Sequence, residues 1–331
     1  MREINTCPIL LASGYDTYSP NGRKYLFDGK KIDCNLDFSF YGEDSTDNLA
    51  SNMQNLSISG AQEKYSAVLD GHKIRLANKN EQGTYILKPA PADKIKDRKE
   101  IPANEHLTMQ IANQAYGIDT AKNGLCFDSN GDVVYITKRY DVTGERKLNQ
   151  EDFASLTGHS LEKDGGNFKY DGSYSDIAHC IKKEISAWMV AMEHFFKLTV
   201  FNYIFGNGDA HLKNFSILNT GTENILAPAY DLINTKMHIN GDDIGLANGF
   251  AQDFCKSDNY EKTGHPCRDD FFRFGTQIGL QSKRVEDILD KFSSFEPKVY
   301  SLIYNSFLST DKHKRNYIRI IEENQKRFVR N

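Results

Sequence analysis

The chain has 331 residues, a net charge of −4 at pH 7, 39% apolar residues and 26% charged residues. This length suits two packed lobes better than one core, and the composition is typical of a soluble globular protein. The acidic balance gives no basic field for direct nucleic-acid binding, and no apolar run approaches the roughly 20 residues of a membrane helix. The six cysteines form no C-x-x-C pair, and the N-terminus lacks a signal-peptide pattern, so we expect a reduced, cytoplasmic protein.

The first strong local signal is a hairpin that follows a loop of small and polar residues. Residues 57–64 (SISGAQEK) precede an apolar strand over 65–69, an Asp-Gly turn at 70–71 and a second strand over 74–76. Asp-Gly between strand-forming residues is a strong hairpin signal. A loop with small residues such as Gly60 and Ala61 can place backbone N–H groups over phosphates. The pattern predicts a phosphate loop carried by a hairpin.

A short apolar strand and a helix come next. The strand over 84–88 presents Lys88, and a helix is predicted to begin at Asn104–Glu105 and to end at Gly117. Lys88 is a candidate contact for the α- and β-phosphates of a nucleotide. Glu105 is a candidate partner of Lys88, but an acidic residue near a helix start also fits the helix dipole. Both interpretations of Glu105 stay open at this point.

The pattern becomes helical from about residue 150, after a second hairpin over 125–140. One apolar helix is predicted over 181–205, and it delivers the chain into Gly206-Asn207-Gly208-Asp209. The two glycines permit a sharp exit that would aim Asp209 into a cleft. A hairpin over 215–227 would then bring Asp231 back beside Asn214. Residues 270–331 show the amphipathic spacing of several helices.

Three polar residues have the spacing of a phosphotransfer site. Asn214 follows Asp209 by five residues, and Asp231 follows Asn214 by 17. In protein kinases such an aspartate faces the substrate hydroxyl, and the asparagine and later aspartate bind the metal ions on ATP. Asp209 is therefore the candidate catalytic residue, and Asn214 and Asp231 are candidate Mg²⁺ ligands. The plainer alternative is that all three satisfy turns, as Asp and Asn commonly do.

The order of these parts is that of a kinase: loop, strand lysine, helix glutamate, catalytic loop and metal aspartate. It predicts an α+β, bilobal, protein-kinase-like fold with a mostly β N-lobe over 1–140 and a helical C-lobe over 141–331. The glycine content of the loop, the sequence Tyr-Asp-Leu in place of Asp-Phe-Gly, and the absence of an A-P-E motif all depart from eukaryotic kinases. Recognition of a protein substrate therefore cannot be inferred from those enzymes.

Seven segments together resemble the HipA-type serine/threonine kinases, the toxins of bacterial toxin–antitoxin modules. They are SISGAQEKYS, YILKP, ANEHLTM, ITKRYDV, RKLNQEDFA, FNYIFGNGDAHLKNFSIL and LAPAYDL, which cover most of residues 55–235. The N-terminal segment is similar to the shortened, HipT-like form, in which an extra subdomain is a separate small protein. The resemblance implies ATP and Mg²⁺ as cofactors and an aminoacyl-tRNA synthetase as target. It also implies a HipB-like DNA-binding antitoxin as partner, with a small HipS-like protein as a further candidate partner.

The resemblance also implies roles for several further residues. It places the adenine hinge at Lys138 and Tyr140, with mainly backbone contacts, and it places Asp141 within reach of the ribose. His211 and Lys213 are candidates for phosphate contacts, although a histidine bonded to a backbone carbonyl is an equal alternative for His211.

Ser57 and Ser59 match the loop serines that become autophosphorylated in this family. We hypothesise that a phosphate here lowers activity, because its two negative charges would compete with ATP beneath the loop. The alternative is that both serines are simply loop residues.

Three other functions are compatible with parts of this pattern. A nucleotide-binding pseudokinase acting as a co-repressor would not need Lys88, Asp209, Asn214 and Asp231 all to be intact, as they are here. A small-molecule phosphotransferase shares the same Asp and Asn spacing, and only the family resemblance opposes it. A metal hydrolase using Asp209 and His211 lacks a third clustered ligand.

Overall fold

The computed structural model describes residues 3–41, 63–92, 95–144 and 146–329. Ser57, Ser59, Gly60 and Ala61, which the sequence assigns to the phosphate loop, lie outside the described residues. The chain divides into two compact units, one formed by Met1–Ala115, Thr120–Arg146 and Lys298–Lys314, and the other by Tyr116–Asp119, Lys147–Pro297 and Arg315–Asn331. The units are therefore not contiguous in sequence, whereas the predicted lobes met at residue 140.

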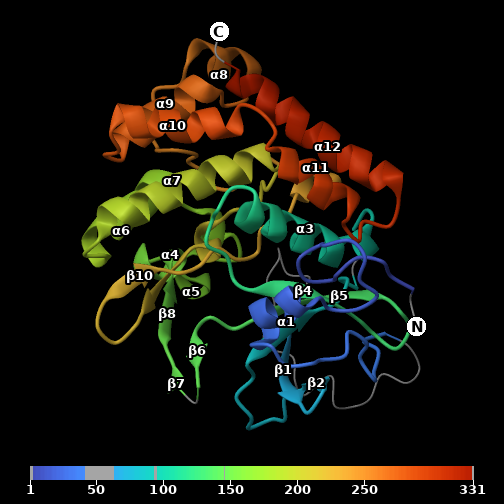
Figure 1. Cartoon of the computed structure of the whole chain (residues 1–331). Helices are drawn as coiled ribbons and strands as arrows, with labels where there is room; N and C mark the ends of the chain where they lie inside the picture. The colour runs from blue at the N-terminus through green and yellow to red at the C-terminus, as the bar shows by residue number, and fades with distance from the viewer. Residues whose placement is uncertain (1–2, 42–62, 93–94, 145, 330–331) are drawn as a thin grey trace. The chain divides into compact units, whose positions relative to one another are not determined.

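The first unit contains an antiparallel sheet of five strands. The strands are β1 (Tyr65–Asp70), β2 (Lys73–Leu76), β3 (Tyr85–Lys88), β4 (Asn123–Phe127) and β5 (Val133–Lys138), in the order β2-β1-β3-β5-β4 (Figure 1). Asp70 pairs with Lys73 across the first turn, and Phe127 pairs with Val133 across the second. Both predicted hairpins are confirmed.

Helix α3 (Ile101–Gln114) packs against β4 and β5 and is buried along most of its length. It begins before Asn104, where the sequence analysis placed its start, because Pro102 occupies its first turn and proline is favoured at that position. Helix α1 (Pro20–Phe27) begins at the N-cap Ser19, whose hydroxyl accepts from the Gly22 N–H. Leu26 and Phe27 of α1 are fully buried.

The second unit combines a small sheet with helices. The strands β8 (Asn149–Asp152), β9 (Ser216–Asn219) and β10 (Asn224–Leu226) pair antiparallel in the order β10-β9-β8, which confirms the hairpin predicted over 215–227. Strand β6 (Val142–Thr143), which belongs to the first unit, pairs with β7 (Arg146–Lys147), where the chain passes from the first unit to the second, in a separate two-stranded sheet. The helices are α4 (Phe153–Leu156), α5 (Leu161–Asp164), α6 (Tyr174–Glu184), α7 (Trp188–Ile204), α8 (Asp258–Thr263), α9 (Arg268–Gln277) and α10 (Ser282–Phe292).

The single helix predicted over 181–205 is wrong, because the chain forms two helices there, α6 and α7 (Figure 1). Ile185, between them, is extended with φ −115° and ψ 119°, and its side chain is only 3% exposed. Neither glycine nor proline marks this break, so burial of Ile185 offsets the helical preference of its neighbours. The expected helices near the C-terminus are present and include α11 (Pro297–Tyr304) and α12 (Asp311–Gln325).

The described helices include none with the length and apolar character needed to cross a membrane.

Candidate functional site

The candidate residues of the first unit include a buried ion pair. Lys88 is the last residue of β3, where it pairs with Tyr135 of β5, and Glu105 lies in the second turn of α3. Lys88 Nζ is 2.6 Å from Glu105 Oε1, and the two side chains are only 3% and 2% exposed. Because a helix dipole acts mainly within the first turn, the ion pair accounts for Glu105 better than helix-end charge does.

The proposed adenine hinge lies in the same unit. Lys138 Nζ forms an ion pair with Asp28 Oδ2 at 2.6 Å, and both side chains are partly exposed. The Asp141 carboxylate is buried and accepts from Arg139 Nε at 2.9 Å and Nη2 at 2.5 Å. A ribose hydroxyl at Asp141 would therefore share an oxygen that already accepts from arginine.

The loop that carries Asp209 leaves α7 through two glycines, as the sequence predicted. Gly206 has φ +69°, a conformation that glycine adopts without strain. A Cβ atom on Gly208 would lie 2.1 Å from the backbone oxygen of Asp242, so no larger residue fits there. The Gly208 N–H donates to Thr235 Oγ1 at 3.0 Å, which fixes the chain directly before Asp209.

Asp209 is half-buried and hydrogen-bonded. Its Oδ1 accepts from the Tyr170 hydroxyl at 2.6 Å. Burial raises the pKa of the Asp209 carboxyl above its ordinary value, whereas the Tyr170 hydrogen bond and the Lys169 ammonium act in the opposite direction. Asp231 adds to the increase in pKa through like-charge repulsion. This carboxylate is thus a better proton acceptor than an exposed aspartate.

His211 is buried and uncharged at neutral pH. Burial, together with the nearby Lys169 ammonium, lowers the pKa of its imidazole to about 3. Its Nδ1 has no hydrogen-bond partner among the described residues. The His211 backbone N–H donates to Asn214 Oδ1 at 3.1 Å, so this histidine orients the asparagine through its main chain.

Asn214 and Asp231 supply oxygen atoms in the same unit. Asn214 Oδ1 accepts one hydrogen bond and keeps a second lone pair, and Asp231 adopts a left-handed φ of +56° that is uncommon outside glycine. Tyr230 ties Asp231 to the loop, because its hydroxyl donates to the Lys213 carbonyl oxygen at 2.8 Å and lies 2.5 Å from Ser216 Oγ. Asp231 acts electrostatically on both Asp209 and His211.

These two residues fit a hard cation that takes further ligands from its substrate. The described residues contain no group of three or more His, Cys, Asp or Glu side chains able to hold a metal ion. An amide oxygen and a carboxylate are the oxygen donors that Mg²⁺ prefers, and phosphates and waters usually complete its shell.

Lys213, a candidate phosphate contact, forms an ion pair that was not predicted. Its Nζ is 2.9 Å from Asp152 Oδ2, and Asp152 also caps α4 by accepting from the Ser155 N–H. Gln150, from the same strand β8, donates to Ser216 Oγ at 3.0 Å. The RKLNQEDFA segment therefore supports the loop that carries Asp209 from a neighbouring strand.

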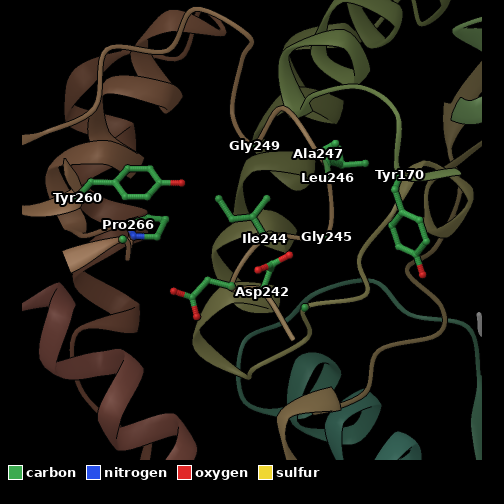
Figure 2. A pocket seen from close by; sticks show the side chains of 12 residues that line it. Tyr170, Asp242, Ile244, Gly245, Leu246, Ala247, Gly249, Tyr260 and Pro266 are labelled. Carbon is green, nitrogen blue, oxygen red and sulfur yellow. The ribbon is translucent and has the colours of Figure 1, made fainter. Parts of the chain in front are cut away.

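A cavity of about 460 Å³ lies beside this loop. Figure 2 shows Tyr170 on one side of the lining segment 242–247 and Tyr260 with Pro266 on the other. Gly208, the residue before Asp209, also lines it. Of the two lining carboxylates, Asp243 forms ion pairs with Lys236 and with Arg327 at 3.2 Å, and its Oδ2 lies 2.6 Å from His265 Nδ1.

Four residues that surround the Asp209 loop were not among the predicted site residues. Tyr230 could have been identified from the sequence, because it directly precedes Asp231 in LAPAYDL, a segment that resembles the family. The signal for Asp152 was weaker, because the resemblance of the RKLNQEDFA segment to the family assigned no role to any of its residues. Lys169 and Tyr170 lie about 40 residues before Asp209, and no local pattern connects them to it.

The sheet, the strand lysine with its helix glutamate, and the Asp209 loop with the later Asp231 define a protein-kinase-like class. The sequence pattern of the HipA-like C-terminal domain family matches residues 56–299, and the chain belongs to this family. The family and fold class predicted from the sequence are confirmed.

Individual relatives share this organisation to different extents. A Haemophilus influenzae protein named "Putative kinase" is 28% identical over 335 residues, which is 92% of each chain. A Sinorhizobium fredii protein named "Putative kinase Y4dM" is 32% identical over 214 residues, and the match spans 60% of this chain and 49% of that protein. HipA of Shewanella oneidensis, solved with HipB and operator DNA, has a similar fold with a TM-score of 0.63 at 18% identity, covering 87% of this chain and 67% of HipA.

Proposed function

We propose that the chain is an ATP- and Mg²⁺-dependent protein kinase that phosphorylates serine or threonine. The observation that carries the proposal is the catalytic loop, where a half-buried Asp209 lies electrostatically coupled to Asp231, with Asn214 oriented in the same loop. The kinase names of relatives and the HipA-like fold support the same class.

Asp209 would orient the acceptor hydroxyl and receive its proton. The acceptor oxygen forms a bond to the γ-phosphorus, the bond from that phosphorus to the β-phosphate oxygen breaks, and ADP leaves. Asn214 and Asp231 would hold Mg²⁺, which offsets the charge on the phosphates. The raised pKa of Asp209 favours proton uptake at this position.

Other residues would bind the nucleotide. Lys88 would contact the α- and β-phosphates, with Glu105 holding its ammonium group in place. The chain at Lys138, Tyr140 and Asp141 would accept the adenine and ribose, and the loop at Gly60 and Ala61 would cover the phosphates. His211, neutral and buried, would support the loop near the γ-phosphate. The acceptor segment would lie in the cavity lined by Tyr170 and Gly208.

The biological role that we propose is that of a toxin in a bacterial toxin–antitoxin module. The fold shared with HipA, which was solved in complex with HipB and operator DNA, supports a HipB-like partner. An aminoacyl-tRNA synthetase in the cytoplasm would be the target, and a small HipS-like protein is a second possible partner. Phosphorylation of Ser57 or Ser59 would restrain the enzyme by displacing the phosphate loop.

The direct test is transfer of labelled γ-phosphate from ATP to a panel of purified aminoacyl-tRNA synthetases. We expect the wild type to label one of them and Asp209→Gln to label none. Nucleotide binding without transfer to any protein would favour the pseudokinase, and transfer to a small alcohol alone would favour the small-molecule phosphotransferase.

Autophosphorylation has its own test, intact-mass analysis of the purified chain. Wild-type protein should carry added phosphate at Ser57 or Ser59, and Asp209→Gln protein should carry none. Absence of phosphate from both would overturn the proposed self-regulation while leaving the kinase assignment standing.

A further inference from the structure

Tyr170 contacts one of the two carboxylate oxygens of Asp209. Its hydroxyl donates to Asp209 Oδ1 at 2.6 Å, the short distance expected for a donor facing a carboxylate. Among the described residues, Oδ2 takes part in no hydrogen bond or ion pair. A carboxylate has two equivalent oxygens, so one fixed bond leaves one defined oxygen for an acceptor.

Tyr170 is itself held from several directions. Its ring meets the His211 ring edge-on, with centroids 5.3 Å apart at 77°, and Lys169 Nζ lies 5.0 Å from the ring centroid. Its backbone N–H donates to the Asn167 carbonyl at 2.8 Å, and its carbonyl accepts from the Ala247 N–H at 2.9 Å. These backbone hydrogen bonds and ring contacts fix the position of the Tyr170 side chain.

The loop around Asp209 gives the carboxylate little other support. Glycine occupies two of the three positions before it, and the described structure gives Asp209 only the Tyr170 hydroxyl as a side-chain hydrogen-bond partner. Without that bond, rotation about the two side-chain torsions would interchange or misdirect the oxygens. Misplacement of a reacting group by about 1 Å can cost roughly a hundredfold in rate.

We propose that Tyr170 is a positioning residue for phosphoryl transfer, which holds Asp209 through Oδ1 so that Oδ2 meets the acceptor hydroxyl. This inference rests on the proposed kinase function. During transfer the acceptor O–H bond breaks, its proton passes to Oδ2, and the Tyr170 hydroxyl keeps its own proton. Tyr170 therefore influences the rate of transfer and leaves the binding of ATP and acceptor unchanged.

The test compares Tyr170→Phe with Tyr304→Phe, a matched control at an exposed tyrosine of α11 that does not line this cavity. The acceptor is the synthetase that the wild type labels in the panel assay. We expect Tyr170→Phe to lower kcat by about 10- to 100-fold, with KM for ATP and for the acceptor within about twofold of wild type. Tyr304→Phe should retain the wild-type kcat.

Three results would overturn the inference. The first is an unchanged kcat in Tyr170→Phe, the second is a loss confined to KM, and the third is a rise in activity, which would make Tyr170 a block on Asp209. A wild type that labels no protein would instead refute the kinase function itself. A crystal structure of Tyr170→Phe gives a readout independent of activity, because an unchanged Asp209 orientation would also contradict the proposal.

Discussion

At the scale of single residues, Lys88 and Glu105 depend on each other because both are buried. Lys88→Met would leave the Glu105 carboxylate in an apolar setting without its partner at 2.6 Å. We expect the free energy of unfolding to fall by about 3–5 kcal/mol, and Lys88→Met with Glu105→Leu to recover most of that loss. Urea denaturation of the two single variants and the double variant measures this coupling.

The surface pair of Lys138 and Asp28 provides the control. Lys138→Met should cost less than about 1 kcal/mol, since exposed ion pairs contribute little. If Lys88→Met proved as mild as Lys138→Met, the buried pair would not carry the energy that its burial implies.

The backbone of Asp231 adopts a strained conformation. Its φ of +56° is accessible to glycine without penalty and costs a residue with a Cβ about 1 kcal/mol. Asp231→Gly should therefore be about 1 kcal/mol more stable than Asp231→Ala, although both should lose phosphoryl transfer. Equal urea midpoints for the two variants would show that the strain is absent in solution.

At the scale of elements, α3 contains a histidine that makes stability depend on pH. His106 is fully buried, its Nε2 lies 2.8 Å from the Ile9 carbonyl oxygen, and its Nδ1 has no partner among the described residues. Burial lowers the pKa of His106 from 6.5 to about 4. The unfolded chain thus binds the proton first, and stability is lost as pH falls from 6.5 towards 4.

We expect this histidine to contribute about 3 kcal/mol at neutral pH that disappears over that window. His106→Gln keeps a donor for the Ile9 carbonyl but does not titrate. Urea denaturation at pH 7 and pH 4.5 should show a smaller loss for the variant than for the wild type. The same loss in both proteins would mean that His106 is not the group responsible.

Local signals in the sequence predict some of these elements, whereas tertiary contacts determine others. The hairpins were predictable because the Asp70-Gly71 and Asn130-Gly131 turns are local signals between strand-forming residues. The break between α6 and α7 was not, because burial of Ile185 decides it without glycine or proline. Spacing made Asp209 and Asn214 candidate site residues, whereas Tyr170 reaches Asp209 only through the tertiary fold.

At the scale of the whole molecule, chain segments distant in sequence complete each unit. Residues 298–314 belong to the first unit, where Ser309 donates through its N–H to Glu100 at 2.8 Å and Asn305 donates to the Leu11 carbonyl at 3.1 Å. No local pattern near the C-terminus indicates such a partner. The sequence therefore predicted the kinase-like class but not which late helix joins the first unit.

The proposed kinase activity requires a metal–nucleotide complex held by Asn214 and Asp231. Calorimetric titration with a non-hydrolysable ATP analogue, in Mg²⁺ and in EDTA, measures this directly for the wild type, Asp231→Asn and the exposed control Asp253→Asn. We predict that Mg²⁺ strengthens binding about tenfold or more, or about 1.4 kcal/mol, in the wild type and the control but not in Asp231→Asn. An equal effect of Mg²⁺ on all three proteins would contradict the account.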